Sequence, residues 1–311
     1  MRIFQGSYQG FDSIFIENNH IKMTIIPEIG GKIASIIYKP QKFEVLFQPS
    51  EPYRIPVYGD SFEKYDTSGI DEMFPNIDVS EYPYGISNMV TLKDHGELWS
   101  VPWGASIDRS RVITQVGGTE LEYSFKRVIE VKNNQIFLDY VITNNSKKSI
   151  LGIWAFHGLL ACDEMTQIFL PADKVINVHD SSVLGKAETL HSFPVAKDLQ
   201  ARDYRLDRVG SPMLNKTEKY YVCGKLKTGQ ASLTLNKNQL LCKMNFNEKK
   251  IPYLGVWINE GGYKNQYNCA LEPSTGYYDS IMRAYNNHAV MEILPGRRNS
   301  WGLELEVMPN Y

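Results

Sequence analysis

The stretch LEYSFKRVIEVKNNQIFLDYVI, residues 121–142, carries the pattern that decides the fold. Apolar residues alternate with polar ones on both sides of the pair Asn133–Asn134, namely Leu121, Tyr123 and Phe125 before it and Ile136, Leu138, Tyr140 and Ile142 after it. A period of two places successive side chains on opposite faces of a β-strand. The stretch therefore predicts two strands, each with one buried face, joined by a short turn.

The same alternation recurs along the whole chain. Further strands are predicted at 13–17, 20–26, 231–235, 239–246, 254–258, 289–294 and 301–308. Helical periodicity is sparse, and the best short candidates are 68–73 and 275–281. No linker or internal repeat divides the chain, so we expect one all-β domain over residues 1–311, built as a large antiparallel β-sandwich. The polar segment 196–219 is interpreted as a lid, an insertion or a surface loop.

Composition and charge exclude several classes of protein. The formal net charge is −2 and the basic residues are scattered, so we expect no binding to nucleic acid. The N-terminal sequence does not resemble a secretion signal, and no run of about 18 apolar residues occurs. We therefore expect a cytoplasmic protein that does not bind membranes and is a monomer or a homodimer. The four cysteines are widely spaced and are interpreted as reduced core residues, namely Cys162, Cys223, Cys242 and Cys269.

The segment DHGELWSVPW, residues 94–103, is the first candidate for a binding site. His95 precedes Trp99 by four residues and Trp103 by eight. An indole face packs against the apolar face of a sugar ring, while histidine and aspartate side chains bond to hydroxyls. The alternative is that both tryptophans are core residues and that His95 lies in a surface loop.

Two further residues have side chains suited to acid/base chemistry. His157 follows an apolar run and is placed at or near the end of a buried strand, where it is either a core histidine or a general acid. Glu272 precedes Pro273, where a strand is expected to stop, and is either a loop glutamate or a general base.

The segment GIDEMFPN, residues 69–76, concentrates polar groups suited to a polyhydroxylated ligand. Asp71, Glu72 and Asn76 are the candidate ligand-binding residues, and the alternative is that the two acids cap a solvated helix. The segment PGRRNSW, residues 295–301, is most simply a turn between the last two strands.

The chain resembles the aldose 1-epimerase (galactose mutarotase-like) superfamily over nearly its full length, within a subgroup marked by GIDEMFPNID. Five segments carry the resemblance, namely IPEIGGKIASIIY (26–38), DHGELWSVPW (94–103), WAFHGLL (154–160), ALEPSTGYYDS (270–280) and LPGRRNSWGLELEV (294–307). The resemblance implies that Glu272 is the catalytic base, that His157 donates a proton to the ring oxygen, and that His95 is the first active-site histidine.

Three departures from the family pattern concern the substrate. GIDEMFPNID stands where many relatives have an arginine-containing segment, so acids would meet the sugar hydroxyls there. Glu97 and Leu98 stand where relatives acting on hexose 6-phosphates commonly have arginine, which favours an unphosphorylated sugar. The family's hydroxyl-binding aspartate has no match by motif, and Trp257, Asn259 and Glu260 are the candidates for that wall.

The resemblance implies interconversion of the α and β anomers of a free sugar by ring opening and reclosure. Such chemistry moves only protons between an acid and a base, so no cofactor and no metal are expected. Two alternatives stay open. One is a carbohydrate-binding or sugar-sensing protein without turnover, and the other is a metal site formed by His95, His157 and Glu272.

Overall fold

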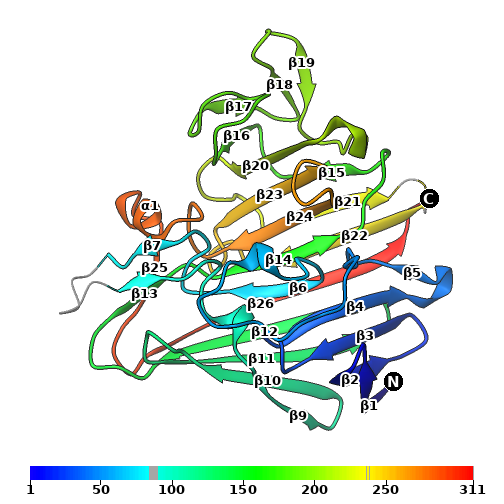
Figure 1. The fold of residues 1–311 in the computed structure, drawn as a ribbon, viewed down its shortest axis with the longest axis vertical. Coiled ribbons are helices and arrows are strands. Elements are labelled where there is room, and N and C mark those ends of the chain that lie inside the picture. Colours follow the sequence, from blue (N-terminus) through cyan, green and yellow to red (C-terminus); the bar gives the residue numbers. More distant parts are fainter. Residues whose placement is uncertain (84–89, 236, 238, 311) are drawn as a thin grey trace.

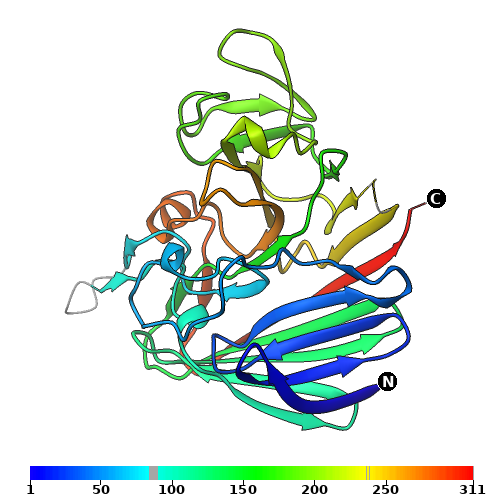
Figure 2. The same ribbon diagram turned by 45° about the vertical axis from the view of Figure 1, so that its right-hand side comes forward.

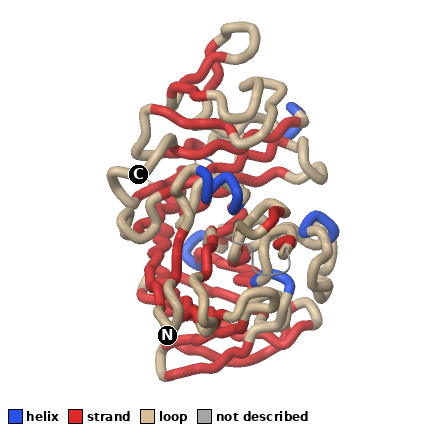
Figure 3. Tube along the Cα trace, turned by 90° about the vertical axis from the view of Figure 1, so that its left-hand side faces the viewer, coloured by secondary structure: helices blue, strands red, loops and turns tan. Residues whose placement is uncertain are grey.

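Two large antiparallel sheets lie one above the other and form most of the molecule (Figure 1). The structure is a computed structural model that describes residues 1–83, 90–235, 237 and 239–310. Within these residues one sheet has 12 strands and the other has 8. The predicted antiparallel all-β sandwich is confirmed, and the helices of the described chain are few and short (Figure 3).

The larger sheet contains the N-terminal strands and the strands that carry the candidate site. Its order is β1-β2-β3-β4-β6-β14-β24-β23-β20-β16-β17, with β5 paired to β4. The bounds are β1 Arg2–Tyr8, β2 Phe11–Glu17, β3 Ile21–Ile26, β4 Lys32–Tyr38, β5 Phe43–Glu44, β6 Ile70–Met73, β14 Ala155–Leu160, β16 Lys174–Asn177, β17 Leu190–Ser192, β20 Lys216–Val222, β23 Tyr253–Glu260 and β24 Tyr267–Ser274.

The smaller sheet has the order β15-β21-β22-β26-β12-β11-β10-β9. Its bounds are β9 Gly104–Asp108, β10 Arg111–Gly117, β11 Tyr123–Lys132, β12 Gln135–Asn144, β15 Gln167–Phe169, β21 Gln230–Leu235, β22 Leu240–Phe246 and β26 Arg298–Pro309. Two-stranded sheets join β7 Ser80–Glu81 to β8 Thr91–Leu92, β13 Ile150–Gly152 to β25 Met291–Ile293, and β18 Val195–Lys197 to β19 Asp203–Arg205. The helices are α1 Ile281–Asn286 and the 3₁₀ helices η1 Lys39–Gln41, η2 Phe62–Lys64, η3 Leu98–Ser100 and η4 Pro212–Leu214.

The hydrophobic core lies between the two sheets. In β11 and β12 the buried residues are those of the sequence alternation, including Tyr123, Phe125, Leu138 and Tyr140. They pack with side chains of the larger sheet such as Phe156 in one apolar cluster. One face of each sheet is therefore used for packing, and the other face of the larger sheet is left for a site.

The two helical candidates differ from the structure. Residues 70–73 form β6, because Ile70 pairs with Ile33 of β4 and Glu72 pairs with Phe156 of β14. Tertiary pairing thus overrides the local helical preference, and the helix predicted at 68–73 is wrong. The helix predicted at 275–281 lies further along the chain, because α1 begins at Ile281 after an N-cap by Ser280.

The segment 196–219 belongs to a lobe that projects from one end of the molecule (Figures 1 and 2). It contains most of the β18–β19 hairpin, then η4, and it ends within β20 of the larger sheet. The lobe also contains β16 and β17. The interpretation of this segment as an insertion therefore describes its first part, whereas its last residues belong to the central architecture.

The cysteines are all free of disulfide bonds in the described chain. Cys242 and Cys269 are buried, as expected for core residues. Cys223 is exposed and Cys162 is half-buried, so the interpretation as core residues is wrong for Cys223. No helix among the described residues is both long enough and apolar enough to span a membrane.

Candidate active site

A cavity of about 180 Å³ opens on the face of the larger sheet that points away from the core. Strand alternation decides which side chains face the side of the cavity. Asp71 on β6, His157 on β14 and Glu272 on β24 share this face of the sheet, whereas Glu72 points into the core. The cavity is lined by Phe62, Thr67, Ile77, Asp78, His95, His157, Leu159, His179, Lys219, Trp257, Tyr263, Gln266, Asn268, Glu272 and Asp279.

The structure brings His95, His157 and Glu272 to this single cavity. They come from a loop before η3, from β14 and from β24, and the last two strands are neighbours in the sheet. The rings of His95 and His157 meet edge to face with centroids 5.4 Å apart. A carboxylate and two imidazoles that are far apart in the chain therefore face one space.

Glu272 is fully buried at the floor of the cavity, within β24 rather than beyond its end. Its Oε2 accepts a hydrogen bond from the ammonium of Lys219, whereas its Oε1 has no partner among the described residues. Burial raises the pKa of Glu272, and the positive charge of Lys219 opposes part of that rise. The free oxygen is therefore the one available to accept a proton.

Lys219 is itself buried, with 8% of its side chain exposed. Burial alone would lower its pKa, but the carboxylates of Asp279 and Glu272 outweigh that effect and raise it. Lys219 therefore carries a positive charge at neutral pH, and that charge lies next to the proposed base.

His157 is enclosed by the sheet and by the ring of Phe62, which meets it edge to face at 5.3 Å. Burial lowers the pKa of His157 well below its usual value, and the neighbouring His95 adds to this effect. When His157 does carry a proton, it is therefore a stronger acid than an exposed imidazolium.

His95 is held in place by two contacts. Its Nδ1 forms a hydrogen bond with Asp94 Oδ1 at 2.8 Å, and its ring stacks on Phe62 with centroids 4.3 Å apart. Burial alone would raise the pKa of Asp94, but the hydrogen bond with His95 helps to hold it below its usual value. Because Nδ1 is occupied by the carboxylate, Nε2 is left for a ligand.

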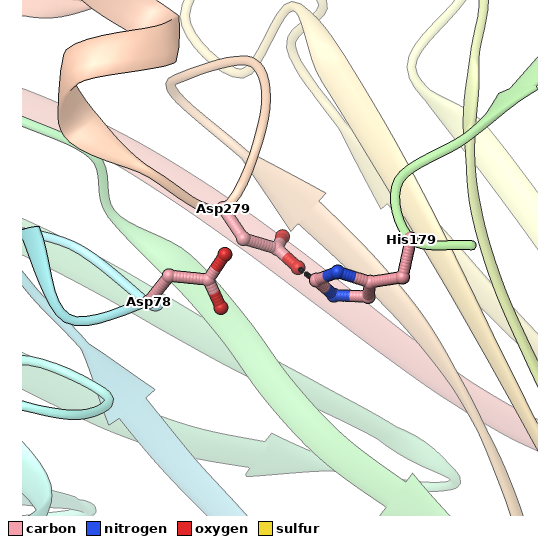
Figure 4. Close-up of side chains that lie close together, drawn as sticks. All are labelled: Asp78, His179 and Asp279. Atoms are coloured by element: carbon pink, nitrogen blue, oxygen red, sulfur yellow. Dashed lines mark ion pairs between the residues drawn. The ribbon is translucent and has the colours of Figure 1, made fainter. Parts of the chain in front are cut away.

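Three more titratable side chains line the cavity, namely Asp78, His179 and Asp279. Figure 4 shows Asp78, His179 and Asp279 with their polar ends turned toward one another, and one atom from each lies within 4.8 Å of the others. Burial raises the pKa of Asp78, and the charge of Asp279 raises it further. These three side chains are of a kind that could hold a metal ion. Positive charge is already present there, because Lys219 Nζ lies 3.9 Å from Asp279 Oδ2.

Of the predicted substrate-binding residues, Trp257 lines the cavity. Asp71 lies on the same face as His157 but is covered, and its carboxylate forms an ion pair with buried Lys32. Burial raises the pKa of Asp71 to about 6. Asn259 and Glu260 do not line the cavity, because Asn259 bonds to Tyr263 and Glu260 to Gly210.

Glu72 points into the core between the sheets and does not reach the cavity. Its carboxylate accepts hydrogen bonds from Arg127 at 3.0 Å, Tyr140 at 2.9 Å and Trp154 at 2.8 Å. The interpretation of Asp71 and Glu72 as a solvated helix cap is wrong, because both side chains are buried in a strand.

Three more of the predicted substrate-binding residues lie outside the cavity, namely Asn76, Trp99 and Trp103. Asn76 donates hydrogen bonds to the backbone carbonyls of Asp78 and Lys93 and so fixes the loop that carries Asp78. Trp99 packs against Phe62 from behind, with centroids 5.0 Å apart. Trp103 is a core residue, which matches the alternative interpretation.

Sequence reasoning missed Lys219, Asp78, His179 and Asp279. Lys219 is the last residue of the polar segment 196–219, which was interpreted as a lid, an insertion or a surface loop, so no strand was predicted there. The order β20-β23-β24 places it near Glu272, and this order does not follow from the sequence. Asp279 lies seven residues after Glu272 in the segment ALEPSTGYYDS, and this short distance along the chain could have indicated that it lies near the site.

Comparisons with solved structures identify the fold. The Slr1438 protein of Synechocystis sp. PCC 6803 superimposes with a TM-score of 0.73 and 14% identity, over 98% of this chain and 99% of the other. A galactose mutarotase related enzyme of Lactobacillus acidophilus superimposes with a TM-score of 0.69 and 15% identity, over 96% of this chain and 98% of the other. A galactose mutarotase-like protein of Lactobacillus casei superimposes with a TM-score of 0.69 and 17% identity, over 95% of this chain and 100% of the other.

No protein-family model matches the chain, and no curated protein matches it either. The likeness in structure extends over nearly the whole length of this chain and of each of these neighbours. The chain therefore has the galactose mutarotase-like fold.

Proposed function

We propose that the protein is an isomerase of the aldose 1-epimerase type, which interconverts the anomers of a free, unphosphorylated sugar. The observation that supports this most is the meeting of Glu272 and His157 in one cavity, with a free carboxylate oxygen on one side and a buried imidazole on the other. Solved structures of the same fold include one described as a galactose mutarotase related enzyme.

The reaction needs one base and one acid. Glu272 Oε1 removes the proton of the anomeric hydroxyl, while a protonated His157 gives a proton to the ring oxygen, so the ring opens to the aldehyde. Rotation about the C1–C2 bond and reclosure with the opposite proton transfers give the other anomer. His95 bonds to the ring or anomeric oxygen through Nε2, and the indole of Trp257 packs against the sugar ring.

The charges in the cavity favour a sugar without a phosphate group. Among the described lining residues, Lys219 is the one lysine or arginine, and Glu272 and Asp279 already surround it. Asp78 and Asp279 would face a phosphate dianion with like charge. Their carboxylates suit hydroxyl groups, which donate hydrogen bonds.

The test is an anomer-exchange assay by NMR on a panel of free sugars. We expect Glu272→Gln and His157→Ala each to slow exchange by about 10²–10⁴-fold, which is the usual contribution of one acid or base. Glu122→Gln and His20→Ala remove the same chemical groups outside the cavity and serve as controls. Equal rates in wild type, Glu272→Gln and His157→Ala would eliminate the assigned roles.

One observation favours a second function, sugar binding without turnover. The ammonium of Lys219 contacts the carboxylate of Glu272, and such pairing makes a carboxylate a weaker base. Saturable binding of a free sugar without any acceleration of anomer exchange would support this second function. Rapid exchange would exclude it.

A further inference from the structure

We propose that Lys219 is a positioning residue that holds Glu272 by its Oε2, and that Asp279 balances the ammonium while Glu272 carries the proton. This inference rests on the proposed function and goes beyond it, because neither Lys219 nor Asp279 belongs to the acid/base pair itself. Lys219 Nζ contacts Glu272 Oε2 on one side and lies 3.9 Å from Asp279 Oδ2 on the other. All three side chains are buried, with exposed fractions of 8%, 0% and 4%.

The reaction creates the need for a second partner. When Glu272 Oε1 takes the proton of the anomeric hydroxyl, the carboxylate becomes neutral and the ammonium loses its counter-charge. A buried charge without a partner is costly. Asp279 takes no part in the proton transfer, so Lys219 keeps all three of its protons and stays paired with that carboxylate. On reclosure Glu272 returns the proton to the sugar, and the site regains its initial charge.

Hydrogen bonding keeps Asp279 ready for this role. The hydroxyl of Tyr221 donates to Asp279 Oδ1 at 2.6 Å, which leaves Oδ2 directed to the side where Lys219 lies. Tyr221 and Lys219 are two residues apart on β20, so their side chains share one face of the sheet. One strand therefore supplies both the cation and the group that fixes its second counter-ion.

A glycine on the intervening strand leaves room for the ring of Tyr221, which holds Asp279. β23 separates β20 from β24, and the residue of β23 that pairs with Glu272 is Gly255. A Cβ at Gly255 would lie 3.1 Å from the ring of Tyr221. Because no side chain stands at this position, the ring of Tyr221 covers it.

Several other titratable groups line the cavity with Glu272, and any pH dependence must account for them. They come from every element around the cavity, namely Asp279 after β24, Asp78 after β6, His95 before η3, His157 on β14 and His179 after β16. Among all these groups, Lys219 is the one in direct contact with its carboxylate in the described structure.

The test measures the pKa of Glu272 directly, by carbon-13 NMR of side-chain carboxyls in the full-length protein. The Glu272 signal is assigned by its loss in Glu272→Gln. We expect Lys219→Met to raise the pKa of Glu272, because an adjacent positive charge is lost. Lys219→Arg keeps that charge, so its pKa for Glu272 should lie close to the wild-type value. We expect Asp279→Asn to lower the pKa, because a negative charge is lost while the acceptor for Tyr221 is kept. If Lys219→Met does not fold, the expected decrease in the pKa of Glu272 in Asp279→Asn still tests the proposal.

The matched control is Lys216→Met. Lys216 lies on the same strand and forms an ion pair with buried Glu260, 3.3 Å away, outside the cavity. We expect this change to leave the pKa of Glu272 as it is in wild type. An unchanged pKa in Lys219→Met or in Asp279→Asn would overturn the proposal, and so would an equal shift in Lys216→Met.

The rate of anomer exchange gives a second measurement. Each unit by which the pKa of Glu272 rises lowers its ionised fraction about tenfold at pH values below the pKa. The pH optimum should therefore move to higher pH in Lys219→Met and to lower pH in Asp279→Asn. The proposed function fails if wild type shows no exchange, whereas the pairing of Lys219 fails if the NMR shifts are absent, so the two results are distinguishable.

Discussion

At the scale of single residues, the neighbours Asp71 and Glu72 show how strand geometry separates side chains of one type. Asp71 faces the side of the cavity and Glu72 faces the core, where Arg127, Tyr140 and Trp154 satisfy it. Both were predicted to bind substrate from their residue type. Had 70–73 been recognised as a strand, its period of two would have allowed only one of them to face a ligand.

Arg127 provides a prediction about stability at this scale. Arg127→Met leaves Glu72 buried without its cation, and we expect the free energy of unfolding to fall by roughly 3–5 kcal/mol. Burial already raises the pKa of Glu72. Without Arg127 the loss in the free energy of unfolding should grow as pH rises above about 4.3. The reason is that Glu72 ionises there in the unfolded chain, whereas burial opposes its ionisation in the folded chain. Urea unfolding at several pH values measures both effects.

Lys126→Met is the control for this prediction. Lys126 is the preceding residue on β11 and its side chain is exposed. A surface substitution of this kind usually changes the free energy of unfolding by less than about 0.5 kcal/mol. Equal losses in the two variants would contradict the role assigned to Arg127.

At the scale of elements, β23 separates the strands that carry Lys219 and Glu272, and its Gly255 accommodates the ring of Tyr221. We expect Gly255→Ala to destabilise the protein by about 1–3 kcal/mol, because the added methyl crowds this ring in a packed region. Thermal or urea unfolding measures the change. Gly104→Ala is the control, because its Cβ would meet nothing closer than 3.7 Å. A loss in both variants would indicate a general cost of replacing glycine in strands.

The order of strands limits what the sequence can reveal about the site. His95, His157 and Glu272 were found because each lies in a recognisable motif. Lys219 was missed because segment 196–219 was interpreted as a lid, an insertion or a surface loop, whereas Lys219 lies in β20 and pairs with Trp257 of β23. Such pairings join segments that are far apart in the chain, and local periodicity holds no information about them.

At the scale of the whole molecule, the alternation that recurs along the chain predicted two packed sheets, because each such strand has one apolar face to bury. The face that remains open then carries the cavity. Its charge is a property of the assembled sheet, since the described lining residues contribute Asp78, Asp279 and Glu272 against Lys219.

This charge leads to a prediction about substrates. We expect a free hexose to be converted with a kcat/KM at least about 10-fold higher than that of its 6-phosphate, because like charges in a cavity repel. Anomer exchange of the two sugars under the same conditions measures the ratio. Asp78→Asn should reduce the difference by removing one negative charge. A preference for the phosphate would contradict the assignment of an unphosphorylated substrate.

The ion pair between Lys219 and Glu272 also bears on how the chain assembles, because the two residues are 53 positions apart. During synthesis Lys219 leaves the ribosome before Glu272 exists. Until β24 arrives, folding β20 into the sheet would remove water from an ammonium group whose closest partner is missing. Completion of the central sheet is therefore coupled to the late addition of β24, and the same event creates the cavity. Enzymatic activity in a refolding experiment should consequently appear together with the pairing of β24 and have no partial value before it.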